Sequence, residues 1–307
     1  MLEDISSVFM SLEPRHFRVL TGIEVGMRYH EWVPVEEVSG YTKLDLGQLH
    51  YILKDLGHKG LLKHQTQPYE GYRIYFEGYD LLALNALVKR GSLSAIGEEL
   101  GVGKESVVYE GLREMVGGLD QQPVILKFHR EGRTSFKQVK RKREHLDGLQ
   151  HFSWIYAARL AAKREFEVMQ QLYPGVSVPE PVDHNRNVLL MAIARGGELS
   201  KTRVVEPEWY MDKILEQVRL AYAMGVVHGD LSEYNIFVSD EGVTLIDWPQ
   251  YVEVGDVRAV ELLERDVGNV LAFFKRKYGV ERDVGEVVGE IMKQTLHRDV
   301  FNFHPIL

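Results

Sequence analysis

The sequence predicts an α+β fold in two parts, and three stretches carry this prediction. Residues 46–88 follow the order helix, β-hairpin, helix, judged by the spacing of their apolar residues. Residues 123–128 form an apolar, strand-like run that nevertheless contains a lysine. Residues 228–247 combine a tight acidic loop, a hairpin and a second acidic residue. The first stretch is typical of a winged helix, and the other two predict a trimmed, bilobal protein-kinase-like fold.

The composition is that of an ordinary globular protein and excludes several functional classes. The 307 residues are 45% apolar and 27% charged, and no apolar run is long enough to span a membrane. Cysteine is absent, which excludes disulfides, thiolate metal sites and thiol catalysis, and favours a reducing, cytoplasmic location. The net charge of −8 argues against a general polycation for nucleic acid.

A chain of this length accommodates about two domains. We expect a winged-helix domain in residues 1–91 and a kinase-like domain in residues 92–307. Within the second domain, we expect an N-lobe at about 92–192, a hinge at about 192–198 and a C-lobe at about 199–307.

The first 91 residues contain three segments with helical spacing and two strand-like runs. The expected helices cover 15–27, 46–56 and 81–88, and the expected strands cover 61–64 and 72–76. Asp45 and Asp80 stand where N-cap residues would open the second and third helices, and Gly57 and Gly91 stand where those helices would end.

A mildly basic face accompanies the expected second helix and the hairpin, and winged helices bind nucleic acid through such a helix. Its members are His50, Lys54, His58, Lys59, Lys63 and His64. Residues 1–91 nevertheless hold 10 Lys and Arg against 12 Asp and Glu. RNA binding and a protein-binding or packing role therefore both stay open.

A glycine-rich stretch follows and reads Gly101-Val102-Gly103-Lys104-Glu105-Ser106. It is not a Walker A loop, because Glu98 stands where that motif needs glycine and Glu105 stands where it needs Ser or Thr. It fits the glycine-rich loop of kinases better, with Val108 in the expected place, although Ser106 replaces the third glycine. We expect the amides of this stretch to bind nucleotide phosphates.

Lys127 lies inside the apolar run of residues 123–128, where a charge is costly unless it is paired or bound to phosphate. Kinases use a lysine there to bind the α- and β-phosphates, and a glutamate of the next helix tethers it. We expect that helix at residues 154–172 and prefer Glu165 as the tether, with Glu167 as the competing candidate and a solvated helix charge as the plain alternative.

Residues 130–143 form a basic segment in which seven of fourteen residues are Lys or Arg. Such a segment can lie against the phosphates of RNA or nucleotide, or it can be an ordinary solvated loop. Residues 189–194 then form another apolar run, broken at Gly196 and Gly197. In a kinase-like fold this would be the hinge, with backbone groups of Met191 to Ile193 facing adenine; an ordinary core strand is the alternative.

The most informative stretch places Asp230 five residues before Asn235 and Asp247 twelve residues after it. Two apolar strands joined by a polar turn separate the last two, so a hairpin would bring Asn235 and Asp247 to the same end. Kinases need a catalytic Asp, an Asn on one Mg²⁺ and a second Asp that bridges metal and phosphates. Two unrelated acidic turns are the alternative. Sixty residues follow Asp247, fewer than a conventional peptide-binding lobe needs.

Taken together, these motifs resemble the atypical RIO protein kinases, in their second, winged-helix-bearing branch. The resemblance covers essentially the whole chain. It rests on the glycine-rich stretch, on Gly132-Arg-Thr-Ser-Phe-Lys137, on His228-Gly-Asp-Leu-Ser-Glu-Tyr-Asn235, on Ile246-Asp-Trp-Pro-Gln250 and on Glu264-Arg-Asp-Val-Gly-Asn269. Two departures stand out: Ala192 follows Met191 in the hinge, and Ser232 replaces the lysine of conventional kinases.

The resemblance implies a serine/threonine kinase and ATPase that uses ATP with Mg²⁺ or Mn²⁺. It implies Asp230 as the catalytic base, Asn235 and Asp247 as metal ligands and Lys127 as the phosphate-binding lysine. The carboxylate that matches Asp247 is also thought to accept a phosphoryl group, and Ser135 matches the autophosphorylation segment. The implied role is late maturation of the small ribosomal subunit, with rRNA and ribosomal proteins as partners.

Two other functions are compatible with parts of the sequence. Small-molecule kinases of the aminoglycoside or choline type also carry His-Gly-Asp, although the short C-terminal lobe and the winged helix speak against them. A nucleic-acid-binding factor whose kinase-like part serves as a scaffold is the second.

Overall fold

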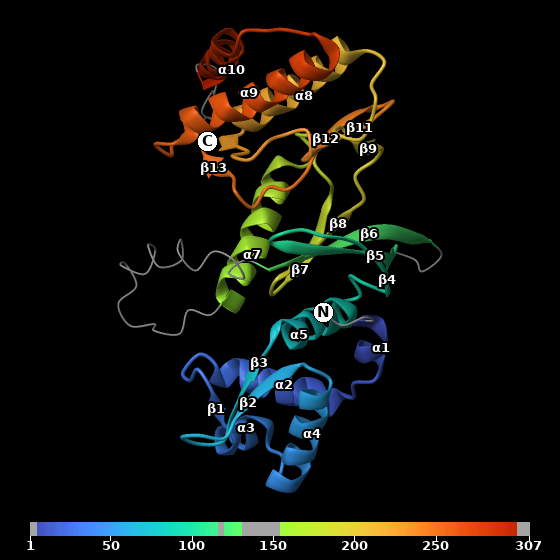
Figure 1. Ribbon diagram of the computed structural model, residues 1–307, viewed down its shortest axis with the longest axis vertical. Coiled ribbons are helices and arrows are strands. Elements are labelled where there is room, and N and C mark those ends of the chain that lie inside the picture. The colour runs from blue at the N-terminus through green and yellow to red at the C-terminus, as the bar shows by residue number, and fades with distance from the viewer. Residues whose placement is uncertain (1–4, 116–119, 131–153, 300–307) are drawn as a thin grey trace, which may run out of the picture. The chain divides into compact units, whose positions relative to one another are not determined.

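The computed structural model describes residues 5–115, 120–130 and 154–299. The chain divides into two compact units. Unit 1 comprises residues 1–163 and 182–191, and unit 2 comprises residues 164–181 and 192–307. Helices and sheets occur in both units (Figure 1), which confirms the α+β class. The boundary expected after residue 91 falls inside unit 1, and the division into functional domains stays a prediction.

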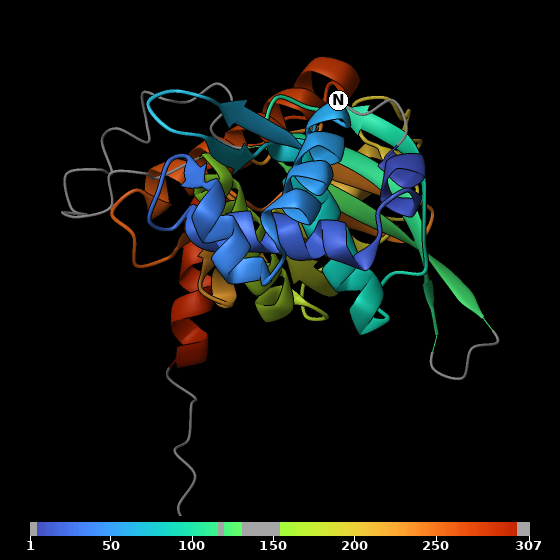
Figure 2. The ribbon, with the colours of Figure 1, turned by 90° about the horizontal axis from the view of Figure 1, so that it is seen from below.

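The N-terminal part of unit 1 is a winged helix, as predicted. Its elements are α1 (Ile5–Met10), α2 (Pro14–Gly26), β1 (Val33–Pro34), α3 (Val35–Thr42), α4 (Leu46–His58), β2 (Leu62–Gln65), β3 (Gly71–Ile74) and α5 (Phe76–Arg90). The strands form an antiparallel sheet in the order β1-β3-β2. Helix α2 packs against α3, α4 and α5, whose ribbons are seen from another side in Figure 2.

Local capping explains two of the helix ends. The Asp45 carboxylate accepts a hydrogen bond of 3.0 Å from the Gln48 amide and so opens α4, as predicted. Gly91 ends α5 with φ of 75°, a left-handed conformation that glycine adopts without strain.

The expected opening of α5 at Asp80 was wrong. The helix begins at Phe76, directly after β3, because Phe76 and Tyr79 are both buried and already supply its apolar face. Asp80 therefore lies inside the helix, with its side chain buried rather than capping.

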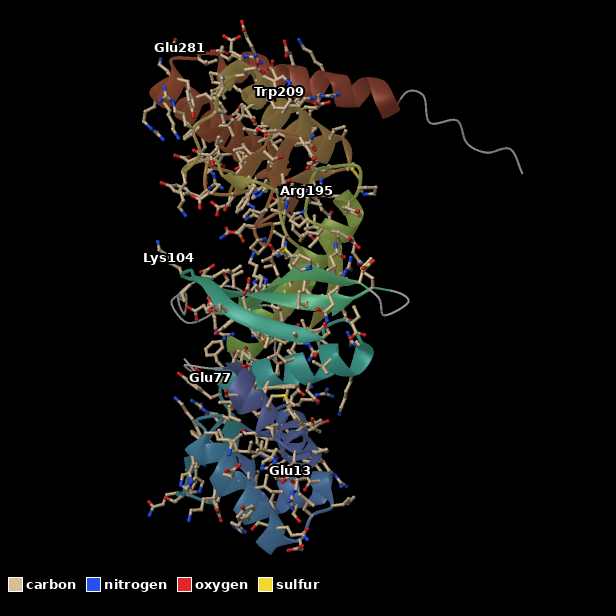
Figure 3. All side chains as sticks on the ribbon, turned by 90° about the vertical axis from the view of Figure 1, so that its right-hand side faces the viewer. Glu13, Glu77, Lys104, Arg195, Trp209 and Glu281 are labelled. Atoms are coloured by element: carbon tan, nitrogen blue, oxygen red, sulfur yellow. The ribbon has the colours of Figure 1, made fainter. Side chains whose placement is uncertain are left out.

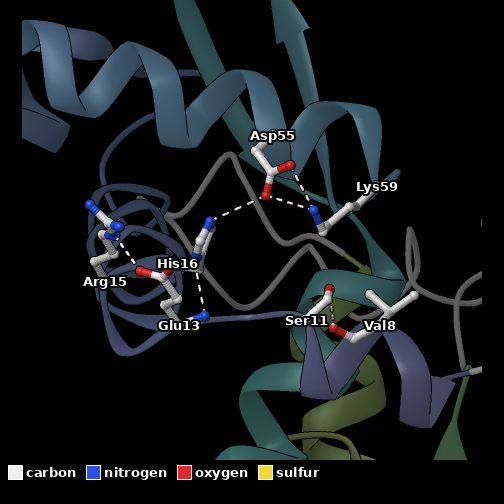
Figure 4. A network of polar contacts seen from close by, with 7 residues as sticks. All are labelled: Val8, Ser11, Glu13, Arg15, His16, Asp55 and Lys59. Atoms are coloured by element: carbon white, nitrogen blue, oxygen red, sulfur yellow. Dashed lines mark hydrogen bonds and ion pairs between the residues drawn. The ribbon is translucent and has the colours of Figure 1, made fainter.

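A polar network joins α2 to α4 in the winged helix (Figure 4). His16 accepts a hydrogen bond of 3.0 Å from the Glu13 amide through Nδ1, and its Nε2 lies 3.2 Å from the Asp55 carboxylate. The Lys59 ammonium donates to both oxygens of Asp55 at 2.6 and 2.7 Å. His16 thus caps the start of α2 and contacts α4 at once.

The rest of unit 1 is built on a sheet of five strands among the described residues, in the order β4-β5-β6-β8-β7. The strands are β4 (Ala95–Val102), β5 (Ser106–Glu114), β6 (Gln121–His129), β7 (Pro181–Asn185) and β8 (Val188–Ala192). Strand β4 was not predicted, because nearly all of its residues are exposed and it has no apolar alternation.

The winged helix and this sheet share one hydrophobic core within unit 1. Buried Leu20 and Leu53 of the winged helix belong to the same cluster as Val107, Leu126 and Leu190 of the sheet. The winged helix is therefore not an independently packed domain, and cutting the chain after residue 91 would expose core side chains.

Helix α7 (Trp154–Leu172) coincides with the predicted helix, and the boundary between the units falls inside it. The other elements of unit 2 are β9 (Gly197–Glu198), α8 (Pro207–Ala223), β10 (Val226–Val227), β11 (Ile236–Ser239), β12 (Gly242–Leu245), β13 (Val252–Glu253), α9 (Ala259–Tyr278) and α10 (Val284–Asp299). Helix α8 packs against α9 and α10. Within the described ranges, no helix combines the length and the apolar character needed to cross a membrane.

Asp55 of α4 gives the stability of this network a pH dependence. Hydrogen bonds from Lys59 hold the pKa of Asp55 below its usual range. A lowered pKa means that the ionised carboxylate stabilises the fold above about pH 4 and that this contribution disappears as the pH falls further. We expect Asp55→Asn to lower the free energy of unfolding by about 1 kcal/mol near neutral pH, because the group is partly exposed. Urea titrations of both proteins should show this difference vanish in acid. Exposed Glu114→Gln is the control.

Candidate active site

The glycine-rich stretch is the turn between β4 and β5. The Gly103 amide donates to the Ser106 carbonyl at 2.8 Å, and exposed Lys104 stands at the tip of the hairpin (Figure 3). Gly101 and Val102 belong to the end of β4 and are exposed, whereas Glu105 is half-buried. Backbone amides at an exposed, glycine-containing turn can approach an anionic ligand closely.

Lys127 lies in register with this turn. Val108 of β5 pairs with Gly101 on one side and with Lys127 of β6 on the other. Residues opposite each other in an antiparallel sheet direct their side chains to the same face. Only 5% of Lys127 is exposed, so this lysine is buried in the sheet, as the apolar run around it predicted.

The acidic loop of unit 2 begins after β10 and is anchored from α9. Buried Asp266, 1% exposed, accepts hydrogen bonds from the amides of Gly229 at 2.7 Å and Leu231 at 3.0 Å. Arg265 donates to the Gly229 carbonyl, and the Asn269 amide donates to the Leu231 carbonyl at 2.9 Å. The two neighbours of exposed Asp230 are therefore fixed, which presents its carboxylate at the surface of the loop.

Only glycine fits before Asp230. Gly229 has φ of 79°, and a Cβ there would lie 2.6 Å from the Gln250 carbonyl oxygen. The next residue has an altered acidity: desolvation, and secondly the negative charge of Asp247, raise the pKa of Asp230. A raised pKa makes this carboxylate a better proton acceptor than an ordinary aspartate.

The predicted hairpin is present and brings Asn235 and Asp247 to one end. Strands β11 and β12 pair from Ile236–Leu245 to Ser239–Gly242, so Asn235 precedes the first pair and Asp247 follows it closely. The Ile246 amide donates to the Asn235 carbonyl at 3.0 Å. The Asn235 side-chain amide donates to the Asp230 carbonyl at 2.9 Å, which leaves its Oδ1 directed away from that bond.

Asp247 has a strained backbone that its neighbours hold. Its φ of 70° is unusual for a residue with a side chain and costs of the order of 1 kcal/mol. On one side, His228 Nε2 lies 3.0 Å from the Ile246 carbonyl oxygen. On the other, the Trp248 amide donates to Glu165 at 3.0 Å. These bonds fix the backbone on both sides of Asp247.

Of the two glutamates considered in α7, Glu165 is completely buried and Glu167 is exposed. Glu165 accepts the hydrogen bond from Trp248, and the neighbouring Arg164 lies over the Tyr251 ring and donates to its carbonyl at 3.2 Å. This role toward the segment after Asp247 was not predicted. The tether to Lys127 stays a prediction.

The expected hinge contains the point where the chain passes from unit 1 to unit 2, between Met191 and Ala192. The Ala192 amide already donates to the Glu180 carbonyl at 2.9 Å, whereas Ile193 is exposed. Gly196, with φ of 87°, lies so close to the Val238 carbonyl that no side chain would fit. Met191 and Ile193 as adenine contacts stay a prediction. Ser135 and residues 131–143 of the basic segment lie outside the described residues.

The donor set at Asn235 and Asp247 suits magnesium. Both offer oxygen atoms, which Mg²⁺ prefers, and Mg²⁺ in phosphoryl-transfer sites usually has only one or two protein ligands besides phosphate and water. Within the described part of the chain, no group of three or more His, Cys, Asp or Glu residues could hold a metal ion by itself. The residues present therefore fit a metal that arrives with a nucleotide.

Sequence reasoning missed the anchoring residues Asp266 and Arg265, although their motif was noted. A usable signal existed, because Asp266 lies among Leu263, Val267 and Val270 on the apolar face of α9. A carboxylate on a buried face must have partners, and those partners are the amides of the acidic loop.

Comparison with known proteins agrees with this geometry. A family model described as the RIO domain matches residues 107–287, and one described as Rio2, N-terminal, matches residues 9–90. The chain belongs to the RIO kinase family. It is 42% identical to the RIO-type serine/threonine-protein kinase Rio2 of Methanocaldococcus jannaschii over 267 residues, which cover 84% of this chain and 94% of the relative.

Other relatives place it in the Rio2 branch of the RIO family. The serine/threonine-protein kinase rio2 of Dictyostelium discoideum is 40% identical over 85% of this chain, and the match spans half of that longer relative. The crystal structure of the Chaetomium thermophilum Rio2 kinase, in an ADP/Mg²⁺–phosphoaspartate complex, superimposes with a TM-score of 0.77 at 28% identity and covers 97% of this chain and 94% of the other. The predicted family and fold are confirmed.

The anchoring of the acidic loop can be tested through Asp266. Burial raises the pKa of Asp266 to about 6, so the folded state binds its proton more tightly than the unfolded state does. The stability linked to this proton is complete below about pH 4 and is lost as the pH rises through about 6.

We expect Asp266→Asn to be destabilised by about 1–3 kcal/mol near neutral pH, because one amide oxygen cannot replace two carboxylate oxygens. As the pH falls from about 7 to about 4, the free energy of unfolding of the wild type should rise by about 3 kcal/mol relative to that of the variant. Urea unfolding across this range measures both effects. A difference that is independent of pH would contradict the assignment.

Proposed function

We propose that this RIO kinase is an ATP- and magnesium-dependent serine/threonine protein kinase and ATPase that acts in maturation of the small ribosomal subunit. The observation that carries the catalytic part is the acidic loop and hairpin, in which Asp230, Asn235 and Asp247 are held by buried Asp266 and Glu165. The serine/threonine-kinase relatives, and the ADP and Mg²⁺ in the Chaetomium structure, support the choice of reaction and cofactor.

Phosphoryl transfer passes through a loose transition state, so the protein mainly positions groups and neutralises charge. Asp230 accepts the proton of the attacking hydroxyl or orients a water molecule. Lys127 and the amides of the glycine-rich turn bind the phosphates. Asn235 and Asp247 would hold Mg²⁺, which supplies the remaining positive charge.

Asp247 also serves as a phosphoryl acceptor in this proposal. One of its carboxylate oxygens forms a bond to the γ-phosphorus while the bond between that phosphorus and the bridging oxygen of ADP breaks, and ADP leaves. Water then releases phosphate. Support comes from the phosphoaspartate in the Chaetomium relative and from the fixed backbone on both sides of Asp247.

The ribosomal part of the proposal rests on the resemblance to the winged-helix-bearing RIO kinases and on the surface of α4. Gln48, His50, Tyr51, Lys54 and His58 are exposed on this helix, which gives it an aromatic and mildly basic face for RNA. The rest of the basic segment, residues 131–143, would add phosphate contacts, whereas Arg130 is buried; Ser135 would be an autophosphorylation site. The proposed location is the cytoplasm, where the enzyme would meet ribosomal particles. The match of residues 9–90 to the Rio2 N-terminal family separates the chain from small-molecule kinases.

The catalytic assignment predicts the behaviour of two single variants. Asp230→Ala and Asp247→Ala should each lower ATP hydrolysis and autophosphorylation by about 10²–10⁴-fold, because each removes a group on which the proposed phosphoryl transfer depends. Melting temperatures should change little, since Asp230 is exposed and Asp247 is half-buried. The matched control is Asp240→Asn in the turn of the same hairpin. Undiminished turnover in either alanine variant would refute the assignment.

RNA binding is tested on the full chain, because the winged helix shares its core with the sheet. We expect Lys54→Ala to weaken binding of a small-subunit rRNA fragment and to reduce the slope of log affinity against log salt by about 1, the loss of one phosphate contact. Fluorescence anisotropy at several salt concentrations measures both. Lys89→Ala, at an exposed position near the end of α5, is the control and should keep the full slope. Equal slopes in all three proteins would favour a protein-binding or packing role for the module.

A further inference from the structure

A buried ion pair connects the winged helix to the nucleotide-binding sheet within unit 1. Asp80, on α5, is 1% exposed, and its carboxylate accepts two hydrogen bonds from the Arg130 guanidinium, one of them at 2.8 Å. The side chain of Asn187, at the β7–β8 turn, donates to the same carboxylate at 2.8 Å. All three side chains are buried, so the carboxylate is enclosed by donors.

Arg130 is also attached to the glycine-rich turn. It follows directly after β6, and its backbone amide donates to the Glu105 carbonyl at 2.7 Å. Its guanidinium lies over the rings of Phe76 at 5.2 Å and Phe128 at 5.7 Å. One residue thus has its side chain fixed by the winged helix and its main chain bonded to the proposed phosphate-binding turn.

The residue before Arg130 is fixed as well. The His129 amide donates to the Asn187 carbonyl at 2.8 Å, and the Asn187 side chain donates to the His129 carbonyl at 3.3 Å. The end of β6 is therefore held on both sides, and the direction of the Arg130 amide toward Glu105 is determined by these contacts.

Stability alone does not explain this arrangement. A buried ion pair loses its hydration, and apolar side chains of similar volume usually stabilise a core as well or better. What such a pair does provide is direction, since a guanidinium that bonds a carboxylate through two nitrogens has one favoured orientation. The glycine-rich turn needs this direction, because Gly101, Gly103 and Lys104 are exposed.

We propose that Asp80 and Arg130 are positioning residues for nucleotide binding, through which the winged helix fixes the glycine-rich turn. This inference rests on the proposed function in so far as the turn binds ATP phosphates. Asp80 orients Arg130, Arg130 holds the Glu105 carbonyl, and the amides around Gly103 are thereby presented to the triphosphate. The winged helix is then part of the nucleotide site and not merely attached to it.

The test replaces the pair by apolar side chains of similar size. The double variant Asp80→Leu/Arg130→Met keeps the core filled and removes the directional contact. The matched control is Glu24→Leu/Arg186→Met, which removes another ion pair between the winged helix and the sheet, at 2.6 Å, without touching the turn. Should the first variant fail to fold, Arg130→Lys keeps the charge and loses the two-nitrogen geometry.

Two readouts are compared in the full-length protein. Calorimetry gives the affinities for a non-hydrolysable ATP analogue with Mg²⁺ and for adenosine. Hydrogen exchange without nucleotide reports on residues 101–106. We expect the Asp80 and Arg130 variants to bind the ATP analogue about five- to tenfold more weakly, which is the equivalent of one lost hydrogen bond. Their affinity for adenosine should equal that of the wild type. Amide hydrogens in the turn should exchange faster than in the wild type. The control should match the wild type in all three measurements.

The proposal is overturned if both double variants weaken binding equally, if adenosine binding falls in parallel, or if exchange in the turn is unchanged. Failure of the wild type itself to bind the ATP analogue would instead refute the proposed function. In that case, faster exchange in the turn would still show that the ion pair positions it.

Discussion

Two hydrogen bonds from the amides of Gly229 and Leu231 to a single buried carboxylate, that of Asp266, hold the acidic loop of unit 2. The loop has a glycine with positive φ, lies at the surface and carries a negative charge, all of which favour alternative conformations. Because Asp266 is buried, with 1% of it exposed, its carboxylate depends on the two amides as hydrogen-bond partners. The position of Asp230 is fixed because the backbone amides of both adjacent residues are hydrogen-bonded to Asp266.

The same arrangement occurs twice more in the described chain. Glu165 is buried in α7 and binds the amide after Asp247, and Asp80 is buried in α5 and binds the arginine after β6. In each case an acidic side chain on a helix loses its hydration on burial and, through its hydrogen bonds, orients a short, irregular segment. The helices are rigid because of their packing, and the buried carboxylates transmit that rigidity to loops that have little packing of their own.

Charge distribution then defines what the site can bind. Desolvation, and secondly the negative charge of Asp247, raise the pKa of Asp230. A divalent cation held by the side-chain oxygens of Asn235 and Asp247 would offset the negative charge at this end of the hairpin. Lys127, 5% exposed in the sheet of unit 1, is the phosphate-binding lysine of the proposed function. The oxygen donors of unit 2 favour a ligand that brings its own metal ion.

Local patterns in the sequence were sufficient for much of this protein. Apolar spacing and capping residues predicted α4 with its Asp45 cap, the whole of α7, and the hairpin that joins Asn235 and Asp247. Such signals come from residues that are close together in the sequence, so they can be recognised without knowledge of the fold. The motif spacing also led to the RIO family, which the comparisons confirmed.

The anchoring contacts required the tertiary structure. Asp266 and Gly229 are 37 residues apart, Asp80 and Arg130 are 50 apart, and Glu165 and Trp248 are 83 apart. A place on an apolar helix face can indicate that an acidic side chain is buried, but it does not name the distant group that the side chain will bind, which is why Asp80 looked like a helix cap and Glu165 only like a partner for lysine. Burial, which turns a carboxylate into an anchor, is a property of the packed core and therefore appears only once the chain has folded.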